Sequence, residues 1–207
     1  MKLIGLTGGI ASGKSLVVSF LKKKKIPVVD ADRIAHEVIK PKKPAYRVIV
    51  TVFGDGILNP DKTINRSILG EIVFSHPEKR RILESTTHPE ILKKIQEEIS
   101  GFKRRKAKMV VIDAPLLFES GLNKKMDLNV LVKIDPNIQL KRLMKRDKLS
   151  ETQAMTRILS QMSTVTKEKL ADFVIDNSGT SKQTERQLLK ILSVLLGLGH
   201  DRDHRAP

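Results

Sequence analysis

The chain has 207 residues, enough for one sizeable core with an inserted or appended subdomain. Lys and Arg number 39 against 23 Asp and Glu, and this excess of +16 favours polyanionic ligands such as nucleotides, phosphorylated cofactors or nucleic acid. The absence of cysteine from the sequence excludes disulfides, a thiol nucleophile and thiolate metal sites. No apolar run reaches the ~18 residues of a membrane-spanning helix, and the first residues show no targeting pattern. We therefore expect a soluble, cytoplasmic protein, with an organellar or membrane-associated form as the alternative.

Aromatic residues make up only 3% of the chain, so its core must be built from Ile, Leu and Val, which suits an α/β protein. Proteins that bind single-stranded nucleic acid usually interleave basic residues with stacking aromatics, and six Phe, one Tyr and no Trp supply few of these. Small phosphorylated ligands are therefore favoured over a specific nucleic acid partner.

Strand and helix patterns alternate along the chain. Short apolar runs bounded by turn residues predict strands within residues 2–7, 26–32, 109–112, 127–135 and 172–179. Helical periodicity is expected at 15–24, across most of 34–108, twice within 137–163, and at 181–199 before a frayed tail at 200–207. Strands that alternate with helices predict a parallel sheet with right-handed crossovers, and the helical stretch before residue 108 is a candidate inserted lobe.

The stretch "GLTGGIASGKS" fits the phosphate-loop pattern G-x-x-x-x-G-K-[ST] and has a predicted strand before it and a helix after it. Backbone N–H groups of such a loop and the positive end of the following helix bind phosphate oxygens, which predicts ATP as a ligand. Lys14 is expected to reach the terminal phosphates and Ser15 to bind Mg²⁺, whereas the alternative is an accidental glycine turn. The residues expected to hold the ATP phosphates are Gly8, Gly9, Ile10, Ala11, Ser12, Gly13, Lys14 and Ser15.

Three aspartates follow predicted strands and therefore belong to the edge of the sheet where ligands bind in open α/β folds. Asp32 is a candidate to accept or orient the proton of an acceptor hydroxyl, and Asp30 lies on the same side if the strand persists that far. The alternative is a turn and an N-cap for the next helix. Asp113 resembles an acid that holds Mg²⁺ directly or through water, although turn chemistry before Ala-Pro is equally compatible.

Arginines recur in the two amphipathic helices within residues 137–163. Arg142, Arg146 and Arg157 are placed to close over a transferring phosphoryl group as parts of a mobile lid, with Arg142 as the catalytic candidate and Arg146 as a phosphate ligand. A solvated charged face is the alternative. The run Lys22–Lys25 ends a predicted helix, where cations interact favourably with the helix dipole, so we interpret it as capping.

Seven stretches in order, "GLTGGIASGKS", "VVDADRIAHEV", "HPEI", "APLLFES", "KRLMKRD", "RILSQM" and "DFVIDNSG", resemble the dephospho-coenzyme A kinase family from Lys2 to about Leu196. The resemblance implies ATP-dependent phosphorylation of the ribose 3′-hydroxyl of dephospho-CoA, the last step of coenzyme A synthesis. It implies Asp32 as the base for that hydroxyl and places Asn177 near the nucleotide base.

The resemblance also implies a three-part body: a P-loop NTPase-type parallel sheet flanked by helices, an inserted helical lobe for the CoA precursor, and a helical lid. The expected bounds are 1–37, 106–139 and 167–200 for the core, 38–105 for the lobe, 140–166 for the lid and 201–207 for the tail. Ala11 stands where relatives often have Gly, which is tolerated if its φ is negative. Leu16 replaces a frequent second hydroxyl residue, so Mg²⁺ ligation rests on Ser15.

Two other functions compete with this interpretation. One is a different small-molecule kinase, such as one acting on a nucleoside monophosphate, which lacks any requirement for a pantetheine arm. The other is a nucleotide-dependent switch or nucleic acid binder, which the charge of +16 favours and which predicts steeply salt-dependent binding with little phosphoryl transfer.

Overall fold

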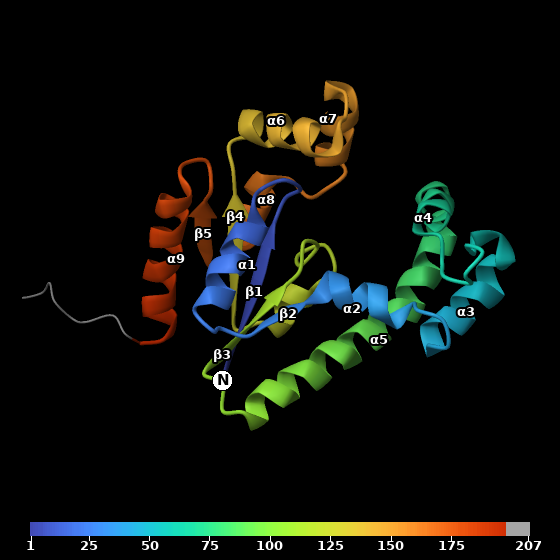
Figure 1. Cartoon of the computed structure of the whole chain (residues 1–207), viewed down its shortest axis with the longest axis horizontal. Coiled ribbons are helices and arrows are strands. Elements are labelled where there is room, and N and C mark those ends of the chain that lie inside the picture. Colours follow the sequence, from blue (N-terminus) through green and yellow to red (C-terminus); the bar gives the residue numbers. More distant parts are fainter. Residues whose placement is uncertain (198–207) are drawn as a thin grey trace, which may run out of the picture. The chain divides into compact units, whose positions relative to one another are not determined.

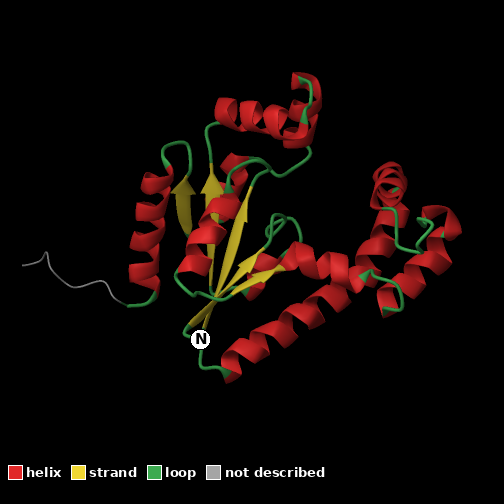
Figure 2. Cartoon of the chain, in the orientation of Figure 1, coloured by secondary structure: helices red, strands yellow, loops and turns green. Residues whose placement is uncertain are grey.

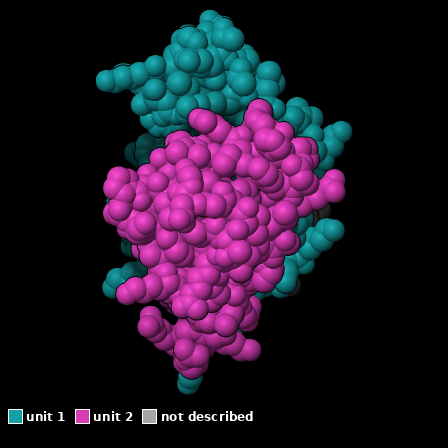
Figure 3. Space-filling view, turned by 90° about the vertical axis from the view of Figure 1, so that its right-hand side faces the viewer, with its two compact units in different colours: residues 1–28, 106–207 teal, residues 29–105 magenta. Residues whose placement is uncertain are grey.

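The computed structural model describes residues 1–197, and the chain divides into two compact units (Figure 3). Unit 1 consists of residues 1–28 and 106–207, and unit 2 of residues 29–105. The predicted tail and the last two residues of the predicted closing helix, 198–199, lie outside the described residues.

A parallel sheet forms the centre of unit 1 (Figure 1). Its strands lie in the order β2-β3-β1-β4-β5. β1 pairs in parallel with β3 and β4, and β4 pairs in parallel with β5. The predicted α/β class is therefore confirmed. The strand bounds are β1 Lys2–Gly8, β2 Val28–Asp30, β3 Met109–Asp113, β4 Leu128–Lys133 and β5 Phe173–Asp176.

One face of this sheet is covered by α1 (Lys14–Lys23) and α9 (Ser181–Leu195), which flank the strands in Figure 2. Alternate residues of the strands point to this face, as the two-residue period of a strand requires. They pack with apolar side chains of both helices into one core, whose buried members include Ile4, Leu6, Val17, Phe20, Val111, Val132, Ile175, Leu188 and Leu192. The aliphatic composition of this core fits the low aromatic content of the sequence.

The connection from β4 to β5 contains three helices, α6 (Pro136–Asp147), α7 (Glu151–Leu159) and α8 (Thr164–Leu170). Asp135 caps α6 and Ser150 forms a capping box with Gln153 at the start of α7, so both expected helices begin at clear sequence signals. The sequence analysis did not resolve α8, which packs against β4. Lys167 of α8 is buried and pairs with Glu119 at 2.8 Å, an arrangement that hydropathy does not reveal.

Unit 2 is helical apart from its first residues in β2, as expected. It contains α2 (Ala31–Val38), α3 (Pro44–Phe53), the short 3₁₀ turns at Asp55–Ile57, α4 (Arg66–Ser75) and α5 (Pro77–Arg104). The long α5 packs against the other three α-helices, and a small core of Ala45, Ile49, Ile57, Ile64 and Leu69 joins them. Within the described residues, no helix is both long and apolar enough to cross a membrane.

Candidate active site

The phosphate loop connects the central strand β1 to α1, as the motif predicts (Figure 1). Gly8 cannot be replaced without movement, because an added Cβ would lie 2.5 Å from Ser12 Oγ and 2.7 Å from the Val132 carbonyl oxygen. Gly13 has a left-handed φ of 84° and precedes the first residue of α1. The two motif glycines are thus required by close packing and by backbone conformation.

The N-terminus of α1 points its backbone N–H groups at the loop. Among the described side chains, none caps this end of the helix, and its first turn contains no acidic residue. An uncapped helix N-terminus that follows a glycine loop is well suited to bind an anion, because the exposed N–H groups and the helix dipole both favour negative charge.

Lys14 and Asp113 form an ion pair at the end of the sheet. Asp113 is the last residue of β3 and lies beside Leu6 of β1, two residues before the loop begins. Both side chains are largely shielded, with 16% and 13% of their surface exposed. The sequence analysis placed both residues in the site without foreseeing that they pair.

The oxygen donors at this edge match the preference of Mg²⁺. Ser15 lies in the first turn of α1 with its surface exposed, and Asp113 offers a carboxylate. Mg²⁺ in nucleotide sites typically keeps several waters and binds one or two protein oxygens together with the phosphates. Residues 1–197 contain no cluster of three or more His, Asp or Glu arranged to hold a metal ion. Ser15 and Asp113 are thus the oxygen donors at this edge that fit Mg²⁺.

The expected alternation of Asp30 and Asp32 on one strand is wrong. The strand β2 ends at Asp30, whose carboxylate accepts a hydrogen bond of 2.9 Å from the Arg33 backbone N–H and caps α2. Asp32 is exposed in the first turn of α2. The capping interpretation of this segment is confirmed for Asp30, because an N-cap side chain here outweighs continuation of the strand.

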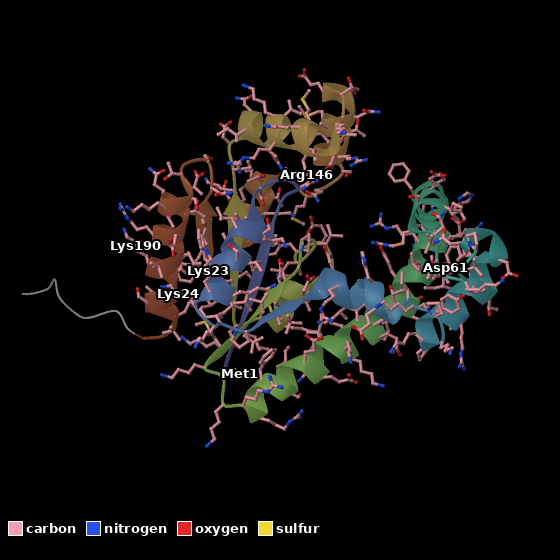
Figure 4. The ribbon with its side chains drawn as sticks, in the orientation of Figure 1. Met1, Lys23, Lys24, Asp61, Arg146 and Lys190 are labelled. Carbon is pink, nitrogen blue, oxygen red and sulfur yellow. The ribbon has the colours of Figure 1, made fainter. Side chains whose placement is uncertain are left out.

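The three arginines of α6 and α7 have different surroundings. A guanidinium nitrogen of Arg142 lies 3.5 Å from the position that a Cβ on Gly13 would take, so Arg142 is at the loop. Arg146, labelled in Figure 4, binds Asp147 through two contacts of 2.7 and 3.1 Å. Arg157 reaches the same carboxylate at 3.1 Å. The hydrogen bond from Arg146 lowers the pKa of Asp147, and Asp147 in turn raises the pKa of Arg146.

Asn177 is buried behind the loop. Its Nδ2 donates to the Ser12 carbonyl oxygen at 2.8 Å, and its Oδ1 accepts a hydrogen bond of 2.8 Å from the Thr184 hydroxyl. A Cβ on Gly13 would lie 2.0 Å from this Nδ2. The amide therefore supports the loop from within the protein, a contact that the sequence analysis did not foresee. Its expected proximity to a nucleotide base stays a prediction.

Ala11 does not meet the condition that the sequence analysis set for it. Its φ is +58°, in the left-handed region that favours glycine. The condition of a negative φ is therefore not met, and the loop holds an alanine in a conformation that costs about 1 kcal/mol.

Two residues that the sequence analysis did not single out contact the loop directly. Gln139 of α6 and Gln161, which follows α7, both hydrogen-bond the backbone of Ile10. Gln161 lies inside the stretch "RILSQM", which the sequence analysis assigned to an amphipathic helix. A polar residue in such a pattern does not indicate its tertiary partner. For Gln139, the only local signal is that a glutamine occupies a buried position of a helix.

A five-stranded parallel sheet with this loop after its central strand defines a P-loop protein of the kinase type. The model of the family described as dephospho-CoA kinase matches residues 2–183, and the chain belongs to this family. The resemblance found in the sequence is thereby confirmed.

Curated relatives carry the same description. The chain is 45% identical over 190 residues to a dephospho-CoA kinase of Halalkalibacterium halodurans, with 92% of this chain and 94% of that protein covered. It is 48% identical to a dephospho-CoA kinase domain-containing protein of Danio rerio, with 94% and 86% covered. The solved structure of dephospho-CoA kinase from Campylobacter jejuni matches with a TM-score of 0.71 and 32% identity over 95% of this chain and 98% of that one.

Proposed function

We propose that the protein transfers the γ-phosphoryl group of ATP to the ribose 3′-hydroxyl of dephospho-CoA and so produces coenzyme A. Membership of the dephospho-CoA kinase family supports the reaction and the substrate. The observation that carries the proposal in this chain is the uncapped start of α1 behind a glycine loop, with Lys14 held at the same end of the sheet. This arrangement suits the terminal phosphates of ATP.

The phosphate-binding part of the site consists of the loop from Gly8 to Ser15. Its backbone N–H groups cradle the phosphates, and Lys14 leaves Asp113 to neutralise charge that develops on the transferring group. Ser15 and Asp113 would hold Mg²⁺, Asp113 directly or through water. When bound, Mg²⁺ would neutralise negative charge on the phosphates. Dependence on Mg²⁺ is part of the proposal.

Asp32 is proposed to orient or accept the proton of the ribose hydroxyl. It lies exposed in the first turn of α2, after the strand that ends at Asp30. Arg142, beside Gly13, is proposed to stabilise the transferring phosphoryl group. Arg146 would have to exchange Asp147 for a phosphate to act as a ligand of ATP.

We also propose that residues 38–105 bind the CoA precursor and that residues 140–166 act as the lid, as the resemblance implies. A cytoplasmic location belongs to the same proposal. The oligomeric state is left open.

The positive charge is proposed to steer anionic ligands. Lys23 and Lys24 at the end of α1 and Lys190 on α9 extend into solvent on one side of unit 1 (Figure 4). Long-range attraction of this kind raises the rate of encounter with polyphosphates and weakens with salt. A specific nucleic acid partner would instead require affinity that persists at physiological salt.

A substrate panel tests the proposal. The purified chain is incubated with ATP, Mg²⁺ and one acceptor at a time: dephospho-CoA, AMP, CMP or shikimate, and acceptor-dependent ADP formation is measured. We expect ADP formation with dephospho-CoA alone, and loss of about 10²–10³ in kcat for the Lys14→Met variant. ADP formation with a nucleoside monophosphate instead would identify a different small-molecule kinase.

A further inference from the structure

The backbone of Ile10 in the phosphate loop is held by two glutamine side chains, one at its N–H and one at its carbonyl oxygen. The Ile10 backbone N–H donates to Gln161 Oε1 at 2.8 Å. Gln139 Nε2 donates to the Ile10 carbonyl oxygen at 2.7 Å. Both distances are those of well-formed hydrogen bonds. We call these three residues the Ile10 clamp.

Gln139 and Gln161 lie near the two ends of the segment that contains α6 and α7, the helices of the proposed lid. Gln139 lies in the first turns of α6, where its backbone N–H bonds to the carbonyl of the N-cap Asp135 at 2.8 Å. Gln161 lies two residues after the end of α7, and α6 packs against α7. The segment between the two glutamines is therefore attached to the backbone of the same loop residue at both of its ends.

The loop provides room for this contact at Gly9. A Cβ on Gly9 would lie 3.1 Å from Gln139 Nε2 and 3.7 Å from Gln161 Oε1. The first distance is tighter than ordinary van der Waals contact, so a side chain at residue 9 would press on the amide of Gln139. Glycine at this position allows the close approach.

Packing alone does not explain Gln139. The residue is only 6% exposed, and a buried amide costs free energy unless its polar atoms are bonded. A methionine or leucine would fill the same volume without that cost. The hydrogen bond to Ile10 is therefore the specific contribution of glutamine at this position.

The clamp also fixes a residue of the proposed phosphoryl-transfer machinery. Arg142 follows Gln139 by three residues in α6, so both side chains lie on one face of the helix. Gln139 attaches this face to Ile10, and Arg142 reaches Gly13 at the other side of the same loop. Release of Gln139 would free α6 to carry Arg142 away from the loop.

We propose that Gln139 and Gln161 are positioning residues that hold the backbone of Ile10 and thereby couple the conformation of the phosphate loop to the placement of α6 and α7. The inference rests on the proposed function, since it concerns binding of ATP at this loop. A loop peptide that is already oriented loses less conformational freedom when phosphates bind, so the clamp favours ATP binding.

Three variants and a matched control test the clamp. Gln139→Met and Gln161→Met each remove one hydrogen bond at similar volume, and the double variant removes both. Gln153→Met is the control, because Gln153 bonds Ser150 in the α7 capping box and has no hydrogen bond to the loop. It removes a polar contact from the same helical segment. Affinity for ATP with Mg²⁺ is measured by calorimetric titration, together with melting temperature, KM and kcat.

Each single variant is expected to weaken ATP binding about fivefold, the factor that corresponds to one hydrogen bond. Both bonds hold the backbone of the same residue, Ile10, so we expect the double variant to lose far less than the product of about 25-fold. Gln153→Met is expected to lower the melting temperature and to leave ATP affinity unchanged. KM for dephospho-CoA should stay near the wild-type value in all variants.

Unchanged ATP affinity in both single variants would overturn the inference. It would also be overturned if Gln153→Met weakened ATP binding as much as they do, or if the double variant lost the full product. The titration requires no phosphoryl transfer. Wild-type protein that binds ATP and yields no product would therefore contradict the proposed function while the clamp is still tested.

Discussion

Lys14 at the start of α1 is paired with Asp113 at the end of β3, so the cation of the phosphate loop is held by a carboxylate of the neighbouring strand. The pairing satisfies both charges, which are mostly shielded from water and would be costly to leave alone. A bound polyphosphate would offer Lys14 a more strongly charged partner, and in that state Asp113 is proposed to bind Mg²⁺.

Substitution of Asp113 therefore has a specific expected result. Asp113→Asn removes the negative charge that Mg²⁺ would contact, and we expect the Mg²⁺ concentration for half-maximal activity to rise about 10–100-fold. Initial rates over a Mg²⁺ series at saturating ATP measure this. Asp127→Asn is the control, since Asp127 bonds the Leu3 backbone N–H at the opposite end of β1. An Asp113→Asn enzyme with a wild-type Mg²⁺ requirement would exclude Asp113 as a ligand.

Asp30 and Asp32, at the start of α2, provide a matched pair of variants. Asp32→Asn is expected to lower kcat about 10²–10⁴-fold with unchanged ATP affinity, because it removes the proposed proton acceptor of the ribose hydroxyl. Asp30→Asn should keep both kcat and stability near wild type, since asparagine is as good an N-cap as aspartate. Steady-state kinetics and ATP titration of both variants measure this. Equal losses of turnover and ATP affinity in Asp32→Asn would contradict the assigned role.

Asn177 links the loop to α9 through a buried amide. Asn177→Ala leaves the Ser12 carbonyl and the Thr184 hydroxyl without this partner, and we expect the free energy of unfolding to fall by about 1–3 kcal/mol. ATP affinity should fall as well, because the Ser12 peptide belongs to the loop. Thr184→Val keeps the bond to Ser12 and should lose stability only. Urea unfolding and ATP titration distinguish the two, and wild-type ATP affinity in Asn177→Ala would argue against support of the loop.

At Ala11 we expect a substitution that raises, rather than lowers, the free energy of unfolding. Ala11→Gly is expected to raise the free energy of unfolding by up to about 1 kcal/mol, because glycine adopts a φ of +58° without steric cost. Ala35→Gly inside α2 should lower it by about 0.5–1 kcal/mol, since glycine is unfavourable in a helix interior. Urea unfolding of both variants measures the difference. A destabilised Ala11→Gly would mean that the loop gains nothing from glycine at residue 11.

The sequence predicted those parts of the fold whose signals are local. The motif located the loop, strand patterns located the sheet, and helical periodicity located the helical stretch that contains α2, α3, α4 and α5. Local signals conflict at Asp30, because the same residues suit a continuing strand and a helix N-cap. In the structure Asp30 is the N-cap of α2. The Ile10 clamp, the Asn177 amide and the buried Lys167 were not predictable, since a polar side chain does not indicate its distant partner.

The most direct test of the central claim is the identity of the product formed from dephospho-CoA, ATP and Mg²⁺. Mass spectrometry measures its mass, and phosphorus NMR locates the added group. We expect a product one phosphate heavier, with the new phosphate on the ribose 3′-oxygen. One ATP should be consumed for each product molecule. A phosphate on any other oxygen, or ATP hydrolysis without a phosphorylated product, would contradict it.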